Sequence, residues 1–271
     1  MLLAVGGLTS CSDTTTPETS GQTGTLRVLL VDAPARLQAV ESLEVVFERV
    51  LVHRGSEVEE LEDGGWITVL SDTLPVEDRT FDLLQLVNGV FATLGEVELE
   101  AGVYTQVRIM LESATLVIDG APQNLFIPSG YQTGIKLVGE FTVEPNVITE
   151  ITVDFDVAQS LHEAPPGSGN YILRPTIRLV QTTLSGTISG IVTPVDIGAV
   201  IYALDPATGD TVTTALADPV TGGYVLQALL AGTYDVRAEA EGYEAATITG
   251  IPVVAGADKP NIDFELAPIG G

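Results

Sequence analysis

The sequence contains a single cysteine, Cys11, among its 271 residues. One thiol cannot form an intramolecular disulfide. A structural zinc site needs several thiolate or imidazole ligands close together, and one cysteine with two distant histidines does not supply them. The role of Cys11 therefore has to be sought in its neighbours.

Histidine is almost as scarce, with only His53 and His162 in the chain. Nucleophilic catalysis needs a base beside a nucleophile, usually histidine with serine or cysteine, and no G-x-S-x-G motif accompanies either residue. The glycine-rich stretches fall between strand-like runs, so nucleotide binding has little support. We expect no enzymatic activity and no cofactor, and we assign both histidines to local hydrogen bonds or to the surface.

Basic residues are few. The chain has 11 Lys and Arg and 37 Asp and Glu, which gives a formal net charge of -26. This balance repels phosphate and excludes nucleic acid as a partner. Acidic residues are in excess on both sides of Leu184, so the charge is not confined to a tail. The charge favours solubility outside the cell, and cation binding is the alternative interpretation.

Long apolar runs are also missing, since nothing after residue 10 approaches the roughly 20 residues that a membrane-spanning helix requires. Residues 1–8 are apolar, and Leu8-Thr9-Ser10-Cys11 places small residues directly before the thiol. This segment resembles the lipobox of bacterial lipoproteins, in which the leader is removed and the cysteine carries a diacylglyceryl group. The resemblance implies a signal peptide over 1–10 and lipid attachment at Cys11. The alternative is a free thiol in a disordered N-terminus.

The lipid chains would be the membrane anchor, because two or more acyl chains give stable attachment. Ser12 resembles the sorting context for the outer membrane in diderm bacteria. Residues 12–23, SDTTTPETSGQT, hold no large apolar side chain. We therefore predict a disordered tether over 11–23, with ends on the order of 20 Å apart.

From Gly24 onward, short runs rich in β-branched and aromatic residues predict strands. In the first unit, placed over 24–182, we expect one short helical turn at 80–89 and no long helix. The runs are TLRVLLV (25–31), LEVVFERVLVH (43–53), WITVL (66–70), VYTQVRIML (103–111), ATLVI (114–118), GIKLVGEFTV (134–143), ITEITVDFDV (148–157) and YILRPTIRLV (171–180).

A second unit, placed over 184–269, contains about seven shorter runs with Pro and Gly between them, which is typical of a small antiparallel sandwich. These runs are GTISGIV, GAVIYALD, DTVTTAL, GGYVLQAL, GTYDVRAEAEGY, EAATITGI and NIDFELAPI. The segment 234–241 alternates strictly, which predicts a charged outward face. The predicted fold class is all-β, with two antiparallel β-sandwich domains in tandem after the lipoprotein signal and linker.

The two units share a short sequence pattern. Leu99-Glu100-Ala101-Gly102-Val103-Tyr104 precedes a strand in the first unit, and Leu230-Ala231-Gly232-Thr233-Tyr234 precedes one in the second. A glycine turn followed by a tyrosine that enters a strand is a natural sandwich corner, in which the phenol bonds nearby backbone. We interpret both tyrosines as structural.

With these residues in view, the second unit resembles the carboxypeptidase regulatory-like, transthyretin-like family. The motifs are GTISGIV, the run GGYVLQALLAGTYDVRAEAEGYEAATITGIPV and NIDFEL. Members are usually non-catalytic modules of extracellular and surface proteins, with a fold related to carbohydrate-binding sandwiches. The resemblance implies a binding or scaffolding role.

The first unit is similar to the domain-of-unknown-function 4382 family of prokaryotic lipoproteins. This resemblance implies an exported location and no particular chemistry. Its motifs are GTLRVLLVDAPA, VLVHR, GWITVL, RTFDLLQLVNG, LEAGVYTQVRIML, QTGIKLVGEFTV, VDFD and YILRPTIRLV.

Three aspartates are candidate metal ligands. Asp154 and Asp156 share one face of a predicted strand, about 7 Å apart. They could bind Ca²⁺ if other oxygens completed a set of about six to eight ligands. Asp32, in the VDAPA turn, is the third candidate. The alternatives are a solvated outer face for Asp154 and Asp156, and a turn that bonds its own backbone for Asp32.

The sequence as a whole predicts an exported, lipid-anchored protein of the outer membrane or cell surface that acts by contact. Its expected partners are the membrane, through lipid, and a glycan or an envelope or matrix protein. Two alternatives remain open. One is a calcium-binding surface protein that uses its acidic faces, and the other is an undetected hydrolase with paired carboxylates.

Overall fold

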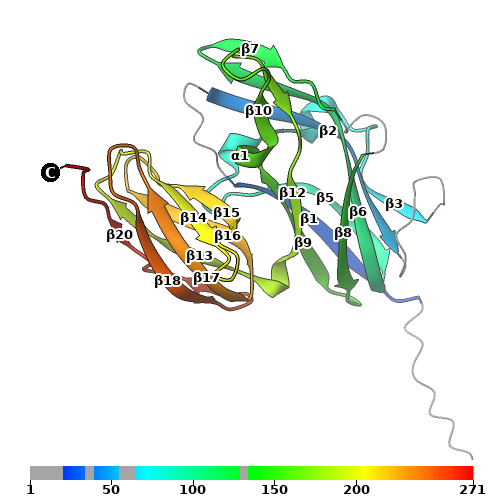
Figure 1. The fold of residues 1–271 in the computed structure, drawn as a ribbon. Helices are drawn as coiled ribbons and strands as arrows, with labels where there is room; N and C mark the ends of the chain where they lie inside the picture. Colours follow the sequence, from blue (N-terminus) through cyan, green and yellow to red (C-terminus); the bar gives the residue numbers. More distant parts are fainter. Residues whose placement is uncertain (1–20, 34–39, 55–64, 129–133, 271) are drawn as a thin grey trace, which may run out of the picture.

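The computed structural model describes residues 21–33, 40–54, 65–128 and 134–270. Two β-rich units lie side by side, each around its own hydrophobic core (Figure 1). Cys11, residues 12–20 of the predicted tether and the acidic segment 55–64 lie outside the described residues. In the part described, no helix is long and apolar enough to cross a membrane.

The described residues of the first unit form twelve strands, and the helical segments among them have three or four residues each. The strands are β1 (Thr23–Ala33), β2 (Val40–Arg54), β3 (Trp66–Leu70), β4 (Thr80–Asp82), β5 (Ala92–Glu100), β6 (Gly102–Ile118), β7 (Ala121–Asn124), β8 (Ile135–Val143), β9 (Ile148–Asp156), β10 (Leu161–Glu163), β11 (Tyr171–Leu173) and β12 (Ile177–Gln181). The helical segments are η2 (Val76–Arg79), η3 (Leu83–Gln85), α1 (Val157–Ser160) and η4 (Thr182–Leu184).

Two sheets of this unit enclose the first core. One has the order β12-β9-β1-β5, and the other has the order β3-β2-β6-β7 with β4 and β8 paired to its central strands. The inward side chains of β1 and β9, such as Val28 and Ile151, are buried in the core between the sheets. The alternation of apolar and polar residues in these strands explains this arrangement, because successive side chains point to opposite faces.

The predicted strands are present, with three instructive differences. The runs 103–111 and 114–118 form one continuous strand, β6. The run 171–180 is divided into β11 and β12 around Pro175, which has no N–H to donate to a ladder. The sequence pattern does not reveal β5, because it carries glutamates and Gly95, residue types that strands disfavour. Within 80–89, where a helical turn is expected, Leu83–Gln85 form the 3-10 turn η3, whereas Thr80–Asp82 form strand β4.

The second unit is a sandwich of two sheets, ordered β15-β14-β17-β18 and β16-β13-β19, with β20 also paired to β13. All seven predicted strands form, and the two-residue β19 is additional. The strands are β13 (Ser185–Thr193), β14 (Val200–Leu204), β15 (Thr211–Leu216), β16 (Gly223–Leu230), β17 (Gly232–Glu239), β18 (Ala246–Val253), β19 (Asp258–Lys259) and β20 (Phe264–Glu265).

The all-β fold class with two tandem units is confirmed, with several antiparallel sheets as predicted. Three pairings are nevertheless parallel: β1 with β9, β13 with β19, and β13 with β20. Each joins strands far apart in sequence, as parallel pairing requires a long crossover connection. In β17, Val236 and Ala238 are buried and Arg237 is exposed, as the strict alternation predicts.

The shared tyrosine corner is also confirmed. The Tyr104 hydroxyl donates to the Glu100 carbonyl at 3.0 Å, and the Tyr234 hydroxyl donates to the Leu230 carbonyl at 2.9 Å. Both bonds span four residues across the glycine turn. Each unit therefore fixes the entry of a central strand by the same side chain-to-backbone bond.

Candidate functional site

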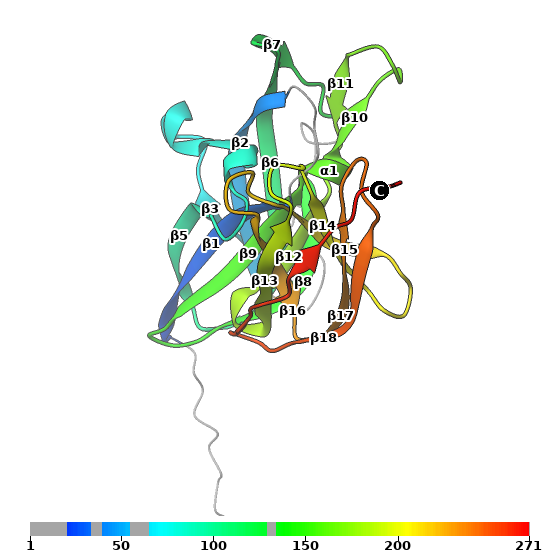
Figure 2. The ribbon, with the colours of Figure 1, turned by 90° about the vertical axis from the view of Figure 1, so that its left-hand side faces the viewer.

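The outer face of the β12-β9-β1-β5 sheet is covered by the second unit. In Figures 1 and 2 the second unit lies against the side of the first that carries β12, β9 and β1. Leu29 and Val31 of β1 point away from the first core, yet both are buried. This sheet therefore has side chains packed on both faces.

Asn88 joins the units through both atoms of its carboxamide. It follows η3 in a left-handed conformation, with φ 54°, which asparagine adopts more readily than most residues. Its Nδ2 donates to the Leu216 carbonyl at 2.9 Å, and its Oδ1 accepts from the Val225 N–H at 3.2 Å. Leu216 ends β15 and Val225 lies in β16, which belong to opposite sheets of the sandwich. The carboxamide therefore acts as an extra peptide group between two sheet edges.

Arg178 lies on β12, at the edge of this sheet. It pairs with Asp154 on the neighbouring strand β9. Burial raises the pKa of Asp154, and the positive charge of Arg178 opposes that rise. Burial also raises the pKa of Tyr234 in the second unit, and the same Arg178 charge opposes it. The charge of Arg178 therefore lowers the pKa of one group in each unit.

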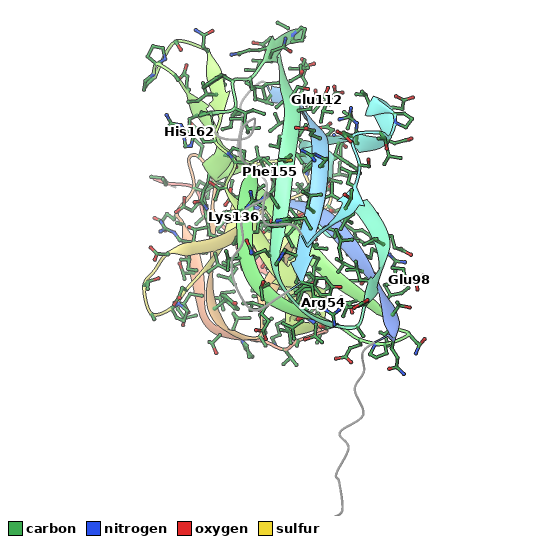
Figure 3. The ribbon with its side chains drawn as sticks, turned by 90° about the vertical axis from the view of Figure 1, so that its right-hand side faces the viewer. Arg54, Glu98, Glu112, Lys136, Phe155 and His162 are labelled. Atoms are coloured by element: carbon green, nitrogen blue, oxygen red, sulfur yellow. The ribbon has the colours of Figure 1, made fainter. Side chains whose placement is uncertain are left out.

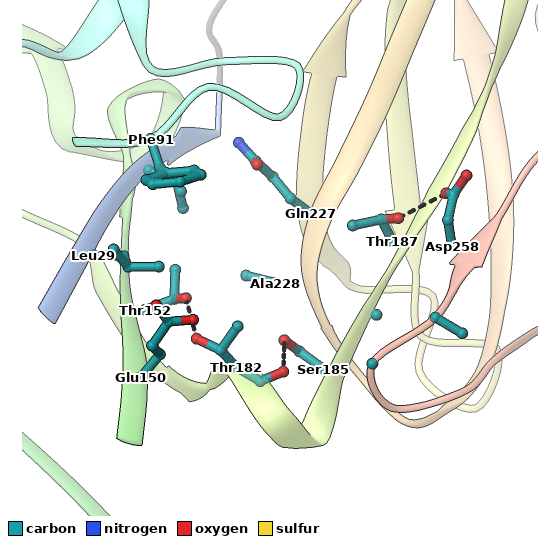
Figure 4. A pocket seen from close by; sticks show the side chains of 14 residues that line it. Leu29, Phe91, Glu150, Thr152, Thr182, Ser185, Thr187, Gln227, Ala228 and Asp258 are labelled. Carbon is teal, nitrogen blue, oxygen red and sulfur yellow. Dashed lines mark hydrogen bonds between the residues drawn. The ribbon is translucent and has the colours of Figure 1, made fainter. Parts of the chain in front are cut away.

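A cavity of about 380 Å³ remains between the units, lined by residues of both (Figure 4). Its volume falls within the roughly 300–1,000 Å³ of small-molecule sites, which often occur at domain interfaces. Leu29, Val31, Phe91 and Ala228 supply the apolar part of the lining. The Phe91 side chain is notable because the residue is 57% exposed. We call this cavity the interdomain groove.

The polar part of the groove is largely engaged in its own bonds. The hydroxyls of Thr152 and Thr182 are 3.0 Å apart, and Ser185 Oγ donates to the Thr182 carbonyl at 3.1 Å. Thr187 Oγ1 donates to Asp258 Oδ1 at 2.7 Å. Figure 4 shows these bonds along the lower and right-hand walls. The groove is therefore a preformed feature of the two docked units.

Asp32 is on the core face of β1, where it is paired with Phe155 and only 1% exposed. Its Oδ1 accepts from the Val157 N–H at 3.1 Å, and the rest of its own turn lies outside the described residues. Its Oδ2 has no hydrogen-bond partner among the described residues. Burial raises the pKa of Asp32 well above its usual value, and nearby Asp154, Asp156 and Asp82 raise it further.

Asp154 and Asp156 are buried, which corrects the interpretation of a solvated outer face. Their partners come from the neighbouring strand β12 and from the turn that follows β9, which the alternation within β9 could not reveal. Asp154 pairs with Arg178, and Asp156 Oδ1 caps α1 by accepting from the Gln159 N–H at 2.9 Å. Alternation along paired strands puts Asp32 on the opposite face.

Within the described residues, no group of three or more acidic, histidine or cysteine side chains could hold a metal ion.

The two histidines lie apart from the groove. His53 is buried and its ring packs against Trp66, with ring centroids 5.1 Å apart. His162 is exposed on β10, far from Arg54 and Glu98 (Figure 3). The sequence does not single out Phe91 and Gln227, which line the groove, or Asn88, which joins the two units. In the sequence, Asn88 stands in an Asn-Gly turn, Phe91 is an apolar residue outside any alternating run, and Gln227 is a polar residue within such a run.

The raised pKa of Asp32 predicts how stability depends on pH. A carboxyl whose pKa is raised on folding stabilises the fold below its unfolded pKa, and this contribution is lost as pH rises through the folded pKa. Asp32→Asn removes that loss, so its melting temperature relative to wild type should rise as the pH rises from the unfolded pKa of about 4 to the raised pKa of the folded state. If the new Asn side chain is left without a hydrogen-bond partner, the resulting loss of stability does not vary with pH. A difference between the two proteins that stays constant across this range would contradict the prediction.

Asp218→Asn is a control of opposite sign. Hydrogen bonds from the Thr221 backbone and side chain lower the pKa of Asp218. Such a group stabilises the fold above its unfolded pKa, and the contribution is lost as pH falls through the folded pKa. The variant should therefore lose melting temperature relative to wild type as the pH rises through the acidic range to the unfolded pKa of about 4, with no further change above it.

The Asn88 bridge predicts that docking can be weakened without unfolding either unit. Asn88→Ala removes two hydrogen bonds, which together contribute about 1–3 kcal/mol. We expect cleavage near residues 181–186 in limited proteolysis and a larger radius of gyration. Asn146→Ala is the matched control, because Asn146 is also left-handed, with φ 57°, and makes no described bond between the units. Equal behaviour of the two variants would argue against the bridge.

Comparisons with known proteins follow the division into two units. The family described as "Domain of unknown function (DUF4382)" matches residues 23–175, and the "Carboxypeptidase regulatory-like domain" matches residues 183–267. No curated protein matches the chain.

Several solved structures show weak likeness. The Bacillus anthracis TIE protein is 14% identical, with a TM-score of 0.23, and the match covers 91% of this chain but 34% of that one. The minor pilin GBS52 of Streptococcus agalactiae is 11% identical, with a TM-score of 0.23 and coverage of 90% and 97%. The major pilin subunit BcpA of Bacillus cereus is 10% identical, with a TM-score of 0.25 and coverage of 91% and 71%.

The chain thus spans about a third of the Bacillus anthracis protein. TM-scores this low carry no weight for function. The family matches are firmer, because the first of them alone covers more than half of the 271 residues. The chain belongs to the DUF4382 family, and its second unit is a carboxypeptidase regulatory-like domain.

Proposed function

We propose that this protein is a non-catalytic lipoprotein of the cell envelope that binds or scaffolds a glycan or a neighbouring envelope protein. The observation that carries the proposal is the interdomain groove, which both units build and which their docking holds open. Binding requires such a preformed surface, and domain interfaces are common places for it.

The domain composition supports the same role. Carboxypeptidase regulatory-like domains are usually non-catalytic modules of extracellular proteins, and the second unit is such a domain. The first unit belongs to the DUF4382 family, and its similarity to domains of prokaryotic lipoproteins supports the same location. The buried acids are engaged in structural bonds, since Asp154 pairs with Arg178 and Asp156 caps α1. These contacts give the acids a role that does not require chemistry on a substrate.

The lipid on Cys11 would hold the groove close to the membrane. Twelve residue steps separate Cys11 from Thr23, where β1 begins, a reach of at most about 40 Å. Because β1 lines the groove through Leu29 and Val31, the tether from Cys11 would lead directly into a strand of the binding surface.

The anchor is tested by removing its attachment atom. Cys11→Ala should move the protein from the detergent phase to the aqueous phase in a detergent-partitioning assay, because no acyl chain can be attached. Ser12→Ala keeps the thiol and is the matched control, which should remain in the detergent phase. Mass spectrometry should find the diacylglyceryl mass on Cys11. Wild-type protein with an unmodified thiol in the aqueous phase would refute the anchor.

Binding is tested with the lipid-free full chain on a glycan array and in cross-linking to envelope proteins. Gln227→Trp should abolish the signal, because an indole at this position fills the groove. Thr247→Trp, on the exposed face of β18, is the control and should bind as wild type does. A ligand retained by both variants would place binding elsewhere, and no ligand on either platform would count against a binding role.

A further inference from the structure

The groove offers hydrogen-bond acceptors more than donors. Of the four hydroxyls that line it, Ser185 donates to the Thr182 carbonyl and Thr187 donates to Asp258. One of the Thr152 and Thr182 hydroxyls donates to the other. Three of the four hydroxyl hydrogens are therefore in use, whereas oxygen lone pairs remain available. A ligand group that only donates hydrogen bonds fits this lining best.

The charge of the groove favours a cation. Glu150 and Asp258 are the charged residues among the described lining, and none of these residues is basic. Arg27 bonds both Glu96 and Glu150 at 2.8 Å, so this triad keeps one net negative charge. Asp258 adds another. The net charge of -26 on the whole chain would attract cations and repel anionic ligands.

Apolar groups complete the lining. Leu29, Val31 and Ala228 are buried residues, and the exposed Phe91 ring stands on the wall across from Asp258 (Figure 4). A methylene chain can pack on such a surface, and an aromatic face attracts a cation within about 6 Å of its centre.

We propose that the interdomain groove binds a primary aliphatic amine, the group carried by the lysine side chain of a partner protein. An ammonium group has three donors and no acceptor, which matches a lining in which three of the four hydroxyl hydrogens are in use and the Gln227 carboxamide donates to the Leu86 carbonyl at 3.5 Å. Its alkyl stem matches the apolar floor, and its charge matches Glu150 and Asp258. This inference rests on the proposed binding function and names the chemistry of the group that is bound.

The first test titrates the full chain with 1,5-diaminopentane, pentan-1-ol and pentanoate, followed by NMR shift changes. The diamine should bind saturably and about tenfold or more tightly than the alcohol, and added salt should weaken it. Pentanoate should not bind. Equal binding of diamine and alcohol, or binding of pentanoate, would overturn the inference.

The second test uses variants of the groove. Glu150→Gln and Asp258→Asn should each weaken diamine binding by about fivefold, and Phe91→Leu, which keeps apolar area but removes the ring, by a similar factor. Glu239→Gln is the matched control for a salt-bridged glutamate, and Phe126→Leu is the control for an exposed phenylalanine. Unchanged affinity in the groove variants, with the melting temperature retained, would overturn the inference.

The source of the amine is tested by comparing the diamine with a short peptide that carries one lysine and no other charge. Tighter binding of the peptide, lost when lysine is replaced by norleucine, supports a protein partner. Peptide binding that survives this replacement contradicts it. If the diamine and the peptide both fail while a glycan binds the wild type and not Gln227→Trp, the amine inference falls and the proposed binding function stands.

Discussion

The docking of the second unit on the outer face of the β12-β9-β1-β5 sheet is the contact on which the other features depend. Without it, Leu29 and Val31 would face water, and the groove would have only one wall. The contact combines buried apolar area with a specific bond pattern, because Asn88 meets one strand from each sheet of the sandwich. Apolar burial supplies most of the attraction, whereas directional hydrogen bonds fix the orientation.

The same contact explains which inferences the sequence supports. Local alternation predicted most strands of both units and the tyrosine corners, since these depend on residues close together in the chain. It did not reveal the burial of Asp154 and Asp156, because a strand covered on both faces has polar residues that look solvent-facing in isolation. Asn88 reads as a turn residue, and its partners are 128 and 137 residues away. No periodic pattern reports a contact of that range.

The buried acids illustrate how one residue type takes different roles in a strongly acidic chain. Asp154 is matched by a cation, Asp156 by a helix N-terminus, and Asp32 by a single backbone N–H. Each solution offsets the cost of burying a carboxyl group to a different degree. Asp32 is the least compensated, and its pKa is accordingly raised well above the usual value.

Strand β1 also determines how tension would travel through the molecule. It begins at the end of the chain nearest Cys11, lies between β5 and β9, and reaches the groove through Leu29 and Val31. Hydrogen bonds in a sheet run across the strands, so a pull along β1 loads its two ladders in shear, with many bonds resisting together. With the proposed lipid on Cys11, a pull by a partner bound at the groove would pass to the membrane along this one strand, which the two ladders hold against shear.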